Sequence, residues 1–136
     1  MKRKHFISSI VPLAATLSAV AKGKTNIGPQ VATAIPPYLK AGDTIGICCP
    51  AGHITQAEIE PALSKIKEWG FTSSVGSTVG KKDFTYGGTD DERLADLQQM
   101  LDDKNIKAIL FARGGFGAIR IIDRVNFKKF KRNPKW

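Results

Sequence analysis

The sequence predicts an α/β fold in which helices pack on the faces of a parallel sheet. From residue 43 onward, short apolar runs alternate with segments that have helical spacing, in the order strand, helix, strand, helix, strand, helix. Two helical segments begin with a capping box, and a glycine-rich turn directly follows the last strand. This order makes the strands parallel, because right-handed crossovers carry each helix over the sheet. Ligands of such folds bind beyond the carboxyl ends of the strands.

The first strand and helix are predicted between residues 44 and 70. The apolar run 44–49 fits a buried strand, and a proline and a glycine follow it closely. Residues 55–58, Thr-Gln-Ala-Glu, have the form of a capping box, and apolar residues recur after it at helical spacing. Pro61 is unfavourable in a helix interior, so the regular part of the helix is predicted to begin near Glu60. Gly70 ends it.

The alternation continues from residue 71 to residue 112. A weak strand is predicted over 71–75, and a polar loop with several glycines follows over 76–88. Thr89-Asp-Asp-Glu92 is a capping box whose acids favour the positive end of the helix dipole. Residues 107–112 form the strongest predicted strand. We expect a site in the loops at the carboxyl ends of the three strands, which are 50–54, 76–88 and 113–117.

The glycine turn Arg113-Gly-Gly-Phe-Gly-Ala118 joins the third strand to a short helix predicted over 119–125. Its glycines permit backbone angles that other residues avoid. A phosphate-binding turn, a nucleophile elbow and a tight turn without chemistry all fit this architecture. The dinucleotide fingerprint requires glycine at the place of Arg120, and the lysine and hydroxyl of a P-loop are missing. The segment alone leaves the three alternatives open.

The two cysteines, Cys48 and Cys49, are neighbours in the first predicted strand. Adjacent residues point to opposite faces of a strand, so no disulfide is expected between them. The chain has no second pair and no zinc-ligand spacing, so no metal site is expected. Both cysteines are predicted to be small apolar strand residues.

The formal net charge of +9 comes largely from the two ends of the chain. The last 13 residues hold six basic residues and no acid. A basic end of this kind binds an anionic polymer in some proteins, but here we interpret it as a solvated, loosely ordered tail. The chain has no aromatic-basic motif of an RNA-binding fold, so a nucleic-acid partner is not expected.

Residues 1–21 have the three-part plan of a secretory signal peptide. A basic start precedes an apolar stretch over 6–21, which ends in an Ala-Val-Ala cleavage signal. The stretch is shorter than the roughly 20 residues of a membrane-spanning helix, so stable membrane insertion is not expected; an uncleaved anchor is the alternative. The sequence therefore predicts an exported protein, periplasmic or extracellular, with residues 22–37 as a tether and a globular domain from Tyr38.

Motifs from Pro36 to the last residue resemble the LD-carboxypeptidase family of serine peptidases. This family includes murein tetrapeptide carboxypeptidases and microcin C self-immunity proteins. The motifs occur in the family's order, and they are residues 36–43 with Pro50-Ala-Gly52, Glu68-Trp-Gly70, Tyr86-Gly-Gly-Thr-Asp-Asp-Glu-Arg93, Ala112-Arg-Gly-Gly-Phe-Gly117, Arg120-Ile-Ile-Asp123 and Asn133-Pro-Lys-Trp136.

The resemblance implies a flavodoxin-like amino-terminal domain over residues 38–136, truncated before the family's remaining strands and without its carboxyl-terminal domain. In the family, the serine nucleophile directly follows the glycine turn, and the second domain supplies a glutamate and a histidine. Ala118 stands at the nucleophile position here, and its methyl group cannot attack a carbonyl. His5 and His53 are not expected to replace the triad histidine. The family uses no metal or organic cofactor, so none is expected.

The other candidate site residues surround Ala118. In an elbow, the backbone amide of Ile119 would be one oxyanion donor, and a second could come from Gly87 or Gly88. Arg113 could hold a substrate carboxylate, or it could brace the turn by pairing with an acid. The full set of oxyanion or substrate-binding candidates is Ile119, Gly87, Gly88, Gly115 and Arg113.

These expectations define two alternative functions for the full-length protein. The first is a serine hydrolase that releases a terminal D-amino acid from murein peptides, with this chain inactive by itself. The second is a non-catalytic protein that binds cell-wall peptides ending in a D-amino acid, because loss of a nucleophile can leave binding intact. A murein peptide is the expected partner in both, and a homodimer of the full-length form is compatible with either.

Overall fold

Strands and helices alternate along residues 34–136, the part of the chain that the computed structural model describes. In chain order the elements are β1 (Thr44–Cys48), α3 (Gln56–Glu68), β2 (Thr72–Val75), α4 (Asp90–Asp102), β3 (Ile106–Phe111), the 3₁₀ helix η1 (Phe116–Ala118), α5 (Ile119–Ile122) and α6 (Lys128–Arg132). The predicted signal peptide and most of the predicted tether lie outside the described residues. Within residues 34–136, no helix combines the length and the apolar character that a membrane crossing requires.

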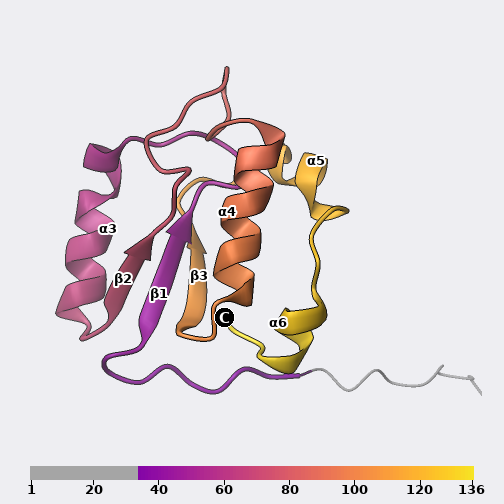
Figure 1. Cartoon of the computed structure of the whole chain (residues 1–136). Coiled ribbons are helices and arrows are strands. Elements are labelled where there is room, and N and C mark those ends of the chain that lie inside the picture. The colour runs from indigo at the N-terminus through magenta and orange to yellow at the C-terminus, as the bar shows by residue number, and fades with distance from the viewer. Residues whose placement is uncertain (1–33) are drawn as a thin grey trace, which may run out of the picture. The chain divides into compact units, whose positions relative to one another are not determined.

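The sheet consists of three parallel strands in the order β2-β1-β3 (Figure 1). In the central strand, Ile45 pairs with Ser73 of β2 on one side and with Ala108 of β3 on the other. The helices α3 and α4 cover opposite faces of the sheet. The predicted α/β class, with a parallel sheet and flanking helices, is confirmed.

Side chains of β1 alternate between the two halves of the core. Ile45 and Ile47 pack with Ile66 of α3, whereas Cys48 packs with Leu97 of α4. This alternation is the two-residue period of a strand, and burial on both faces explains why the sequence of β1 is apolar from Ile45 to Cys48.

Both cysteines are buried and free. Cys48 is the last residue of β1, and Cys49, which was predicted to belong to the strand, directly follows it. Burial, with the nearby charge of Asp96, raises the pKa of the Cys48 thiol to about 12. Burial also raises the pKa of Cys49. Because the thiolate is the reactive form, burial disfavours reaction at both side chains, which fill space in the core as small apolar groups.

Helix α3 begins at Gln56, so the predicted start near Glu60 is wrong. The amide of Glu58 donates to Thr55 Oγ1 at 3.3 Å, and the amide of Thr55 donates to Glu58 Oε2 at 2.8 Å. Pro61 lies in the second turn, where its missing N–H removes a single bond of the helical ladder. The capping box therefore holds the first turn in place despite the proline.

Helix α4 starts with the second predicted capping box, formed by Thr89 and Glu92. The amide of Thr89 donates to Glu92 Oε2 at 2.9 Å, and Lys81 Nζ lies 2.8 Å from Glu92 Oε1. The hydrogen bond from Lys81, together with the one from the Thr89 amide, lowers the pKa of Glu92 to about 2. This carboxylate therefore joins the loop after β2 to the first turn of α4.

Acid is expected to weaken this capping box. The pKa of Glu92 falls from an ordinary 4.5 to about 2 on folding, so its carboxylate stabilises the fold fully above pH 4.5 and loses that effect as the pH falls toward 2. Glu92→Gln keeps an acceptor for the Thr89 amide but lacks the charge. Its free energy of unfolding, measured by urea denaturation across this pH range, should fall less steeply than that of the unsubstituted chain. Glu60→Gln removes an exposed carboxylate from α3 as a control, and an unchanged slope in Glu92→Gln would contradict the prediction.

The chain after β3 differs from the sequence prediction. The helix predicted over 119–125 is shorter, because α5 ends at Ile122, and the turn before it is already the 3₁₀ helix η1. The last residues are ordered, so the interpretation as a loosely ordered tail is wrong. Phe130 of α6 packs against the core beside α4, and Lys135 Nζ donates to the carbonyl of Met100 at 3.1 Å. These contacts hold α6 against the carboxyl end of α4.

The backbone of Trp136 lies beside β3. Its N–H donates to the carbonyl of Lys107 at 3.1 Å, and its carbonyl accepts from the amide of Ile109 at 2.7 Å. Lys107 and Ile109 are the two neighbours of Ala108. A residue that bonds to both neighbours of another residue is paired with it as in a parallel sheet. Trp136 therefore covers the first half of the β3 edge, while Leu110 and Phe111 in the second half are 43% and 46% exposed.

Candidate functional site

The loops that follow the three strands meet at the carboxyl edge of the sheet, as predicted. The amide of His53 donates to the carbonyl of Thr85 at 3.2 Å, and Gly52 forms a bridge with Tyr86, so the first two loops are joined directly. The glycine turn lies against them and completes a hollow of about 230 Å³. Its lining comes from all three loops and consists of Gly52, Thr85, Tyr86, Gly114, Gly115, Phe116 and Gly117.

Two glycines give the turn its shape. Gly115 has a φ of 137°, in the region that favours glycine. At Gly117, a Cβ would lie 2.8 Å from the ring of Tyr86 and 3.0 Å from the Cα of Ala51, so the backbone packs directly against both neighbouring loops. The turn is therefore a closely fitted part of the site.

Ala118 is partly buried and lies where η1 passes into α5. Its φ and ψ of −64° and −34° are helical, and its amide donates to the carbonyl of Gly115 at 3.4 Å. The residue directly follows the glycine turn at the carboxyl edge of the sheet, which is the position that the family resemblance assigns to a nucleophile. A methyl group there has no lone pair with which to attack.

The candidate oxyanion donors differ in whether their amides are already engaged. The amide of Ile119 donates within the 3₁₀ turn to Phe116, and the amide of Gly87 donates to the carbonyl of Ala51 at 3.0 Å. Among residues 34–136, the amides of Gly88 and Gly115 have no acceptor. An oxyanion would compete with existing bonds at Ile119 and Gly87. Of the two amides without an acceptor, that of Gly115 belongs to the lining of the hollow, whereas Gly88 is buried and does not line it.

Arg113 pairs with an acid of helix α3. Its Nη2 lies 3.2 Å from Glu58 Oε1, and both side chains are about half exposed. Of the two roles that the sequence left open, this contact favours bracing of the turn.

Arg93, which was not predicted as a site residue, connects all three loops. It is 1% exposed, and its Nη1 donates to the carbonyls of Pro50 at 2.5 Å and Gly117 at 2.8 Å. Its Nε donates to the carbonyl of Gly88 at 3.2 Å. One guanidinium therefore binds a backbone carbonyl in each of the three loops that follow β1, β2 and β3, and so holds the three loops together.

The surroundings of Arg93 fix its orientation. It pairs with Asp90, and its guanidinium lies over the ring of Tyr86, 4.7 Å from the centroid. Asp90 also accepts from Arg120, whose Nη2 is 2.9 Å away, and this hydrogen bond is the main reason why the pKa of Asp90 lies below its usual value. The acids after Thr89 were explained as capping residues, but Asp90 also joins α4 to α5.

A second buried polar residue of α4, Asp96, holds the start of the loop after β2. It is 3% exposed and accepts from the amides of Ser77 at 2.9 Å and Thr78 at 3.1 Å, and also from the hydroxyl of Thr78. Thr78 Oγ1 in turn accepts from the amide of Cys49 at 2.8 Å. The carboxylate thus links the ends of β1 and β2.

The sequence contains a signal for both residues. Arg93 and Asp96 lie three residues apart, and Leu97 and Met100 follow at helical spacing, so all four occupy the same buried face of α4. A charged residue on a buried helix face needs partners, which makes it a candidate for a structural or functional network.

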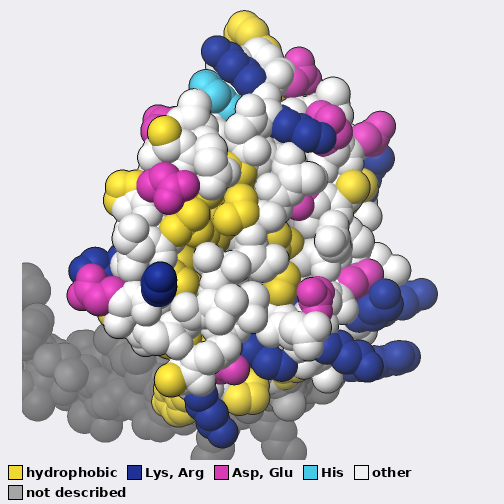
Figure 2. Space-filling view, turned by 60° about the vertical axis from the view of Figure 1, so that its left-hand side comes forward, with side chains coloured by type: hydrophobic (Ala, Val, Ile, Leu, Met, Phe, Trp, Pro, Cys, Tyr) yellow, Lys and Arg dark blue, Asp and Glu magenta, His cyan; other side chains and the backbone are white. Residues whose placement is uncertain are grey.

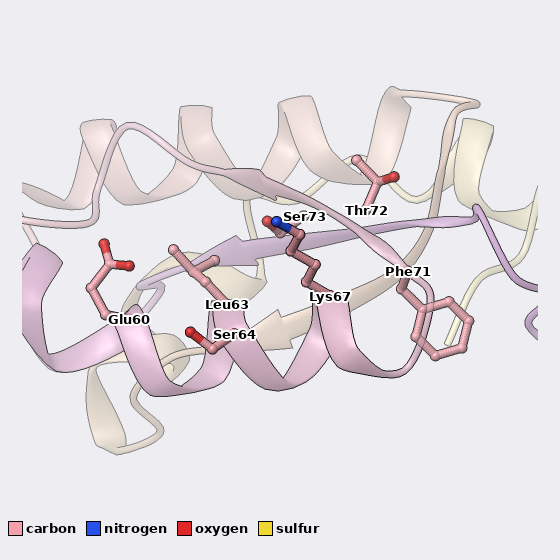
Figure 3. A pocket seen from close by; sticks show the side chains of 7 residues that line it. All are labelled: Glu60, Leu63, Ser64, Lys67, Phe71, Thr72 and Ser73. Atoms are coloured by element: carbon pink, nitrogen blue, oxygen red, sulfur yellow. The ribbon is translucent and has the colours of Figure 1, made fainter.

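Another hollow, of about 440 Å³, lies away from this edge between α3 and β2 (Figure 3). None of the predicted site residues lines it. Among residues 34–136, no group of three or more His, Cys, Asp or Glu side chains is arranged to hold a metal ion.

The fold and the turn define the class of domain, a parallel α/β domain that places the residue after a glycine turn at the carboxyl edge of its sheet. A family profile described as the LD-carboxypeptidase N-terminal domain, peptidase family S66, matches residues 45–136. The chain belongs to the LD-carboxypeptidase family.

Curated relatives agree with this membership. A probable murein peptide carboxypeptidase of Bacillus subtilis is 37% identical over 100 residues, covering 74% of this chain and 31% of that protein. A putative carboxypeptidase of Treponema pallidum is 30% identical over 100 residues, covering 71% of this chain and 30% of that protein. The chain therefore spans just under a third of the length of these relatives.

Solved structures share the fold. The microcin C7 self-immunity protein MccF, in complex with aspartyl sulfamoyl adenosine, matches with a TM-score of 0.71 at 24% identity, over 76% of this chain and 32% of that one. Muramoyltetrapeptide carboxypeptidase from Oxalobacter formigenes matches with a TM-score of 0.59 at 20% identity, over 68% of this chain and 31% of that one.

Proposed function

We propose that this chain supplies the amino-terminal domain of an exported LD-carboxypeptidase-type protein that acts on murein peptides. We also propose that the chain by itself releases no terminal D-amino acid. Membership of the family and the murein peptide carboxypeptidase among the relatives support the substrate class.

The alanine at position 118 is the observation that supports the proposed lack of activity. It follows a closely packed glycine turn at the carboxyl edge of the sheet, where a serine would be presented to a substrate. A serine nucleophile also needs a base that removes its proton. His53 is the one histidine among the described residues, and the family resemblance places the triad's glutamate and histidine in the second domain.

Ala118 also favours the binding function as a second candidate. The turn keeps its packing, and the amide of Gly115, which lines the hollow, has no acceptor within residues 34–136. Such an amide suits a peptide carbonyl or carboxylate oxygen. A domain of this kind would hold a cell-wall peptide that ends in a D-amino acid without cutting it.

The first test is release of D-alanine from a murein tetrapeptide, measured by chromatography with the full chain. No release above the rate without protein is expected. Ala118→Ser is expected to be equally inactive, because the family resemblance places the base for the serine in the second domain. Release by either protein would overturn the proposal that this domain is inactive alone.

The second test is isothermal titration of the same tetrapeptide into the full chain. Heat of binding that disappears with the tripeptide, which lacks the terminal D-alanine, would support the binding function. Gly115→Ala is the site variant, because an alanine at a φ of 137° distorts the turn, and it should weaken binding. Equal heats for both peptides would exclude recognition of the D-residue.

A further inference from the structure

The basic residues near the carboxyl end of the chain divide into two groups. Three are engaged, since Arg124 pairs with Asp91, Lys129 pairs with Asp102, and Lys135 donates to helix carbonyls. The other three have no acidic partner within residues 34–136, and these are Lys128, Lys131 and Arg132. Figure 2 shows Lys and Arg side chains along the lower part of the molecule, the end at which α6 lies in Figure 1.

One of these free cations lines a cavity of about 480 Å³ between α4 and α6. The cavity has room for a phosphate group together with part of a molecule that carries it. Its lining contains three cations, one acid and one amide, and consists of Asp102, Lys104, Lys129, Arg132 and Asn133.

The cavity has an excess of positive charge. Its one acid, Asp102, is already paired with Lys129 at 3.0 Å. Lys104 and Arg132 have no ion-pair partner among the described residues, and residues 1–33 contain no Asp or Glu that could supply one. Two uncompensated cations therefore face the same cavity.

Neutralising the carboxyl end of α4 does not explain these charges. Cations near the last turn of a helix stabilise its free carbonyls. In α4, however, Lys135 already serves this purpose, because its Nζ donates to the carbonyls of Met100 at 3.1 Å and Asp103 at 2.5 Å. Lys104 and Arg132 are additional to that contact.

We propose that the α4–α6 cavity binds a phosphate group. A guanidinium matches phosphate oxygens with two parallel hydrogen bonds, and an ammonium supplies a further point charge. Arg132 and Lys104 provide this pair, and the side-chain amide of Asn133 offers one more donor. Two free positive charges balance the two negative charges of a phosphate monoester, whereas a carboxylate would balance only one.

Titration of the full chain with inorganic phosphate, followed by NMR at the Asn133 and Lys129 amides, tests the site. Arg132→Ala and Lys104→Ala should each weaken binding about tenfold or more, since each removes a charge-assisted hydrogen bond. Arg132→Lys should lose less. Lys82→Ala removes the same charge from the loop after β2 and should leave the affinity unchanged. The proposal would be overturned if the NMR chemical shifts did not saturate with phosphate. It would also be overturned if Lys82→Ala weakened phosphate binding as much as Arg132→Ala and Lys104→Ala.

Vesicles distinguish a lipid source of the phosphate from a soluble one. Both kinds of vesicle contain phosphatidylcholine, and one also contains phosphatidylglycerol, an anionic lipid. Stronger sedimentation with phosphatidylglycerol that Arg132→Ala reduces and Lys82→Ala does not would assign a lipid headgroup. Phosphate binding without this difference would assign a soluble phosphate compound. Vesicle binding that Arg132→Ala and Lys82→Ala reduce equally would reflect overall charge and contradict a built site.

Discussion

Replacing Arg93 with alanine is expected to lower the free energy of unfolding by about 3–5 kcal/mol, as is typical when one partner of a buried charged network is removed. The side chain is 1% exposed and donates to carbonyls of Pro50, Gly88 and Gly117. Removing it leaves these acceptors without their buried donor and leaves a void under Tyr86. Urea denaturation of the full chain measures the change.

Two further variants separate the network from simple charge. Arg120→Ala removes an exposed partner of the same carboxylate, Asp90, and should change stability by less than about 1 kcal/mol. Arg93→Lys retains the charge, but one ammonium cannot reproduce the planar fork that reaches three loops, so an intermediate loss is expected. If Arg93→Ala were no less stable than Arg120→Ala, the guanidinium would not be what holds the loops together.

The parts of the fold that were predicted correctly depend on local sequence signals. The capping boxes at Thr55 and Thr89 and the apolar run of β1 act within a few residues, so the sequence alone identifies them. The start of α3 was misplaced because Pro61 was given more weight than the capping box. A proline removes one backbone bond, whereas the box satisfies two free amides at the helix start.

Contacts between residues far apart in the chain explain what was missed. Arg93 meets Pro50 and Gly117, and Trp136 meets Lys107, through carbonyls that carry no sequence signal of their own. The basic end was interpreted from its composition, which cannot show that Phe130 packs against the core. The sequence also carries no signal that the amide of Ile119 is already engaged by carbonyls of the preceding turn.

The site edge therefore has a scaffold that does not depend on the side chain at position 118. Arg93 and Asp96 both come from α4, and both act on backbone groups of the loops rather than on the hollow itself. Loss of a nucleophile leaves these contacts unchanged. This separation explains how the shape of the site can persist in a chain with Ala118, and it is the structural basis for considering a binding function.

Replacing Asp96 with asparagine is expected to lower the free energy of unfolding by about 2–4 kcal/mol, since a buried donor left without an acceptor costs about 1–3 kcal/mol. Asparagine has nearly the same shape, so no void is created. Its NH₂ group, however, cannot accept a hydrogen bond in either orientation of the amide. It leaves without an acceptor either the Ser77 amide or the amide and hydroxyl of Thr78, which share one carboxylate oxygen. Urea denaturation measures the loss, and hydrogen exchange at the Ser77 or Thr78 amide should quicken, according to which of them faces the NH₂ group. As a control, Asp91→Asn removes an exposed acid of the same helix and should lower the free energy of unfolding by less than about 1 kcal/mol. If Asp96→Asn lowered the free energy of unfolding by no more than this control, the Asp96 carboxylate would not be required to join the ends of β1 and β2.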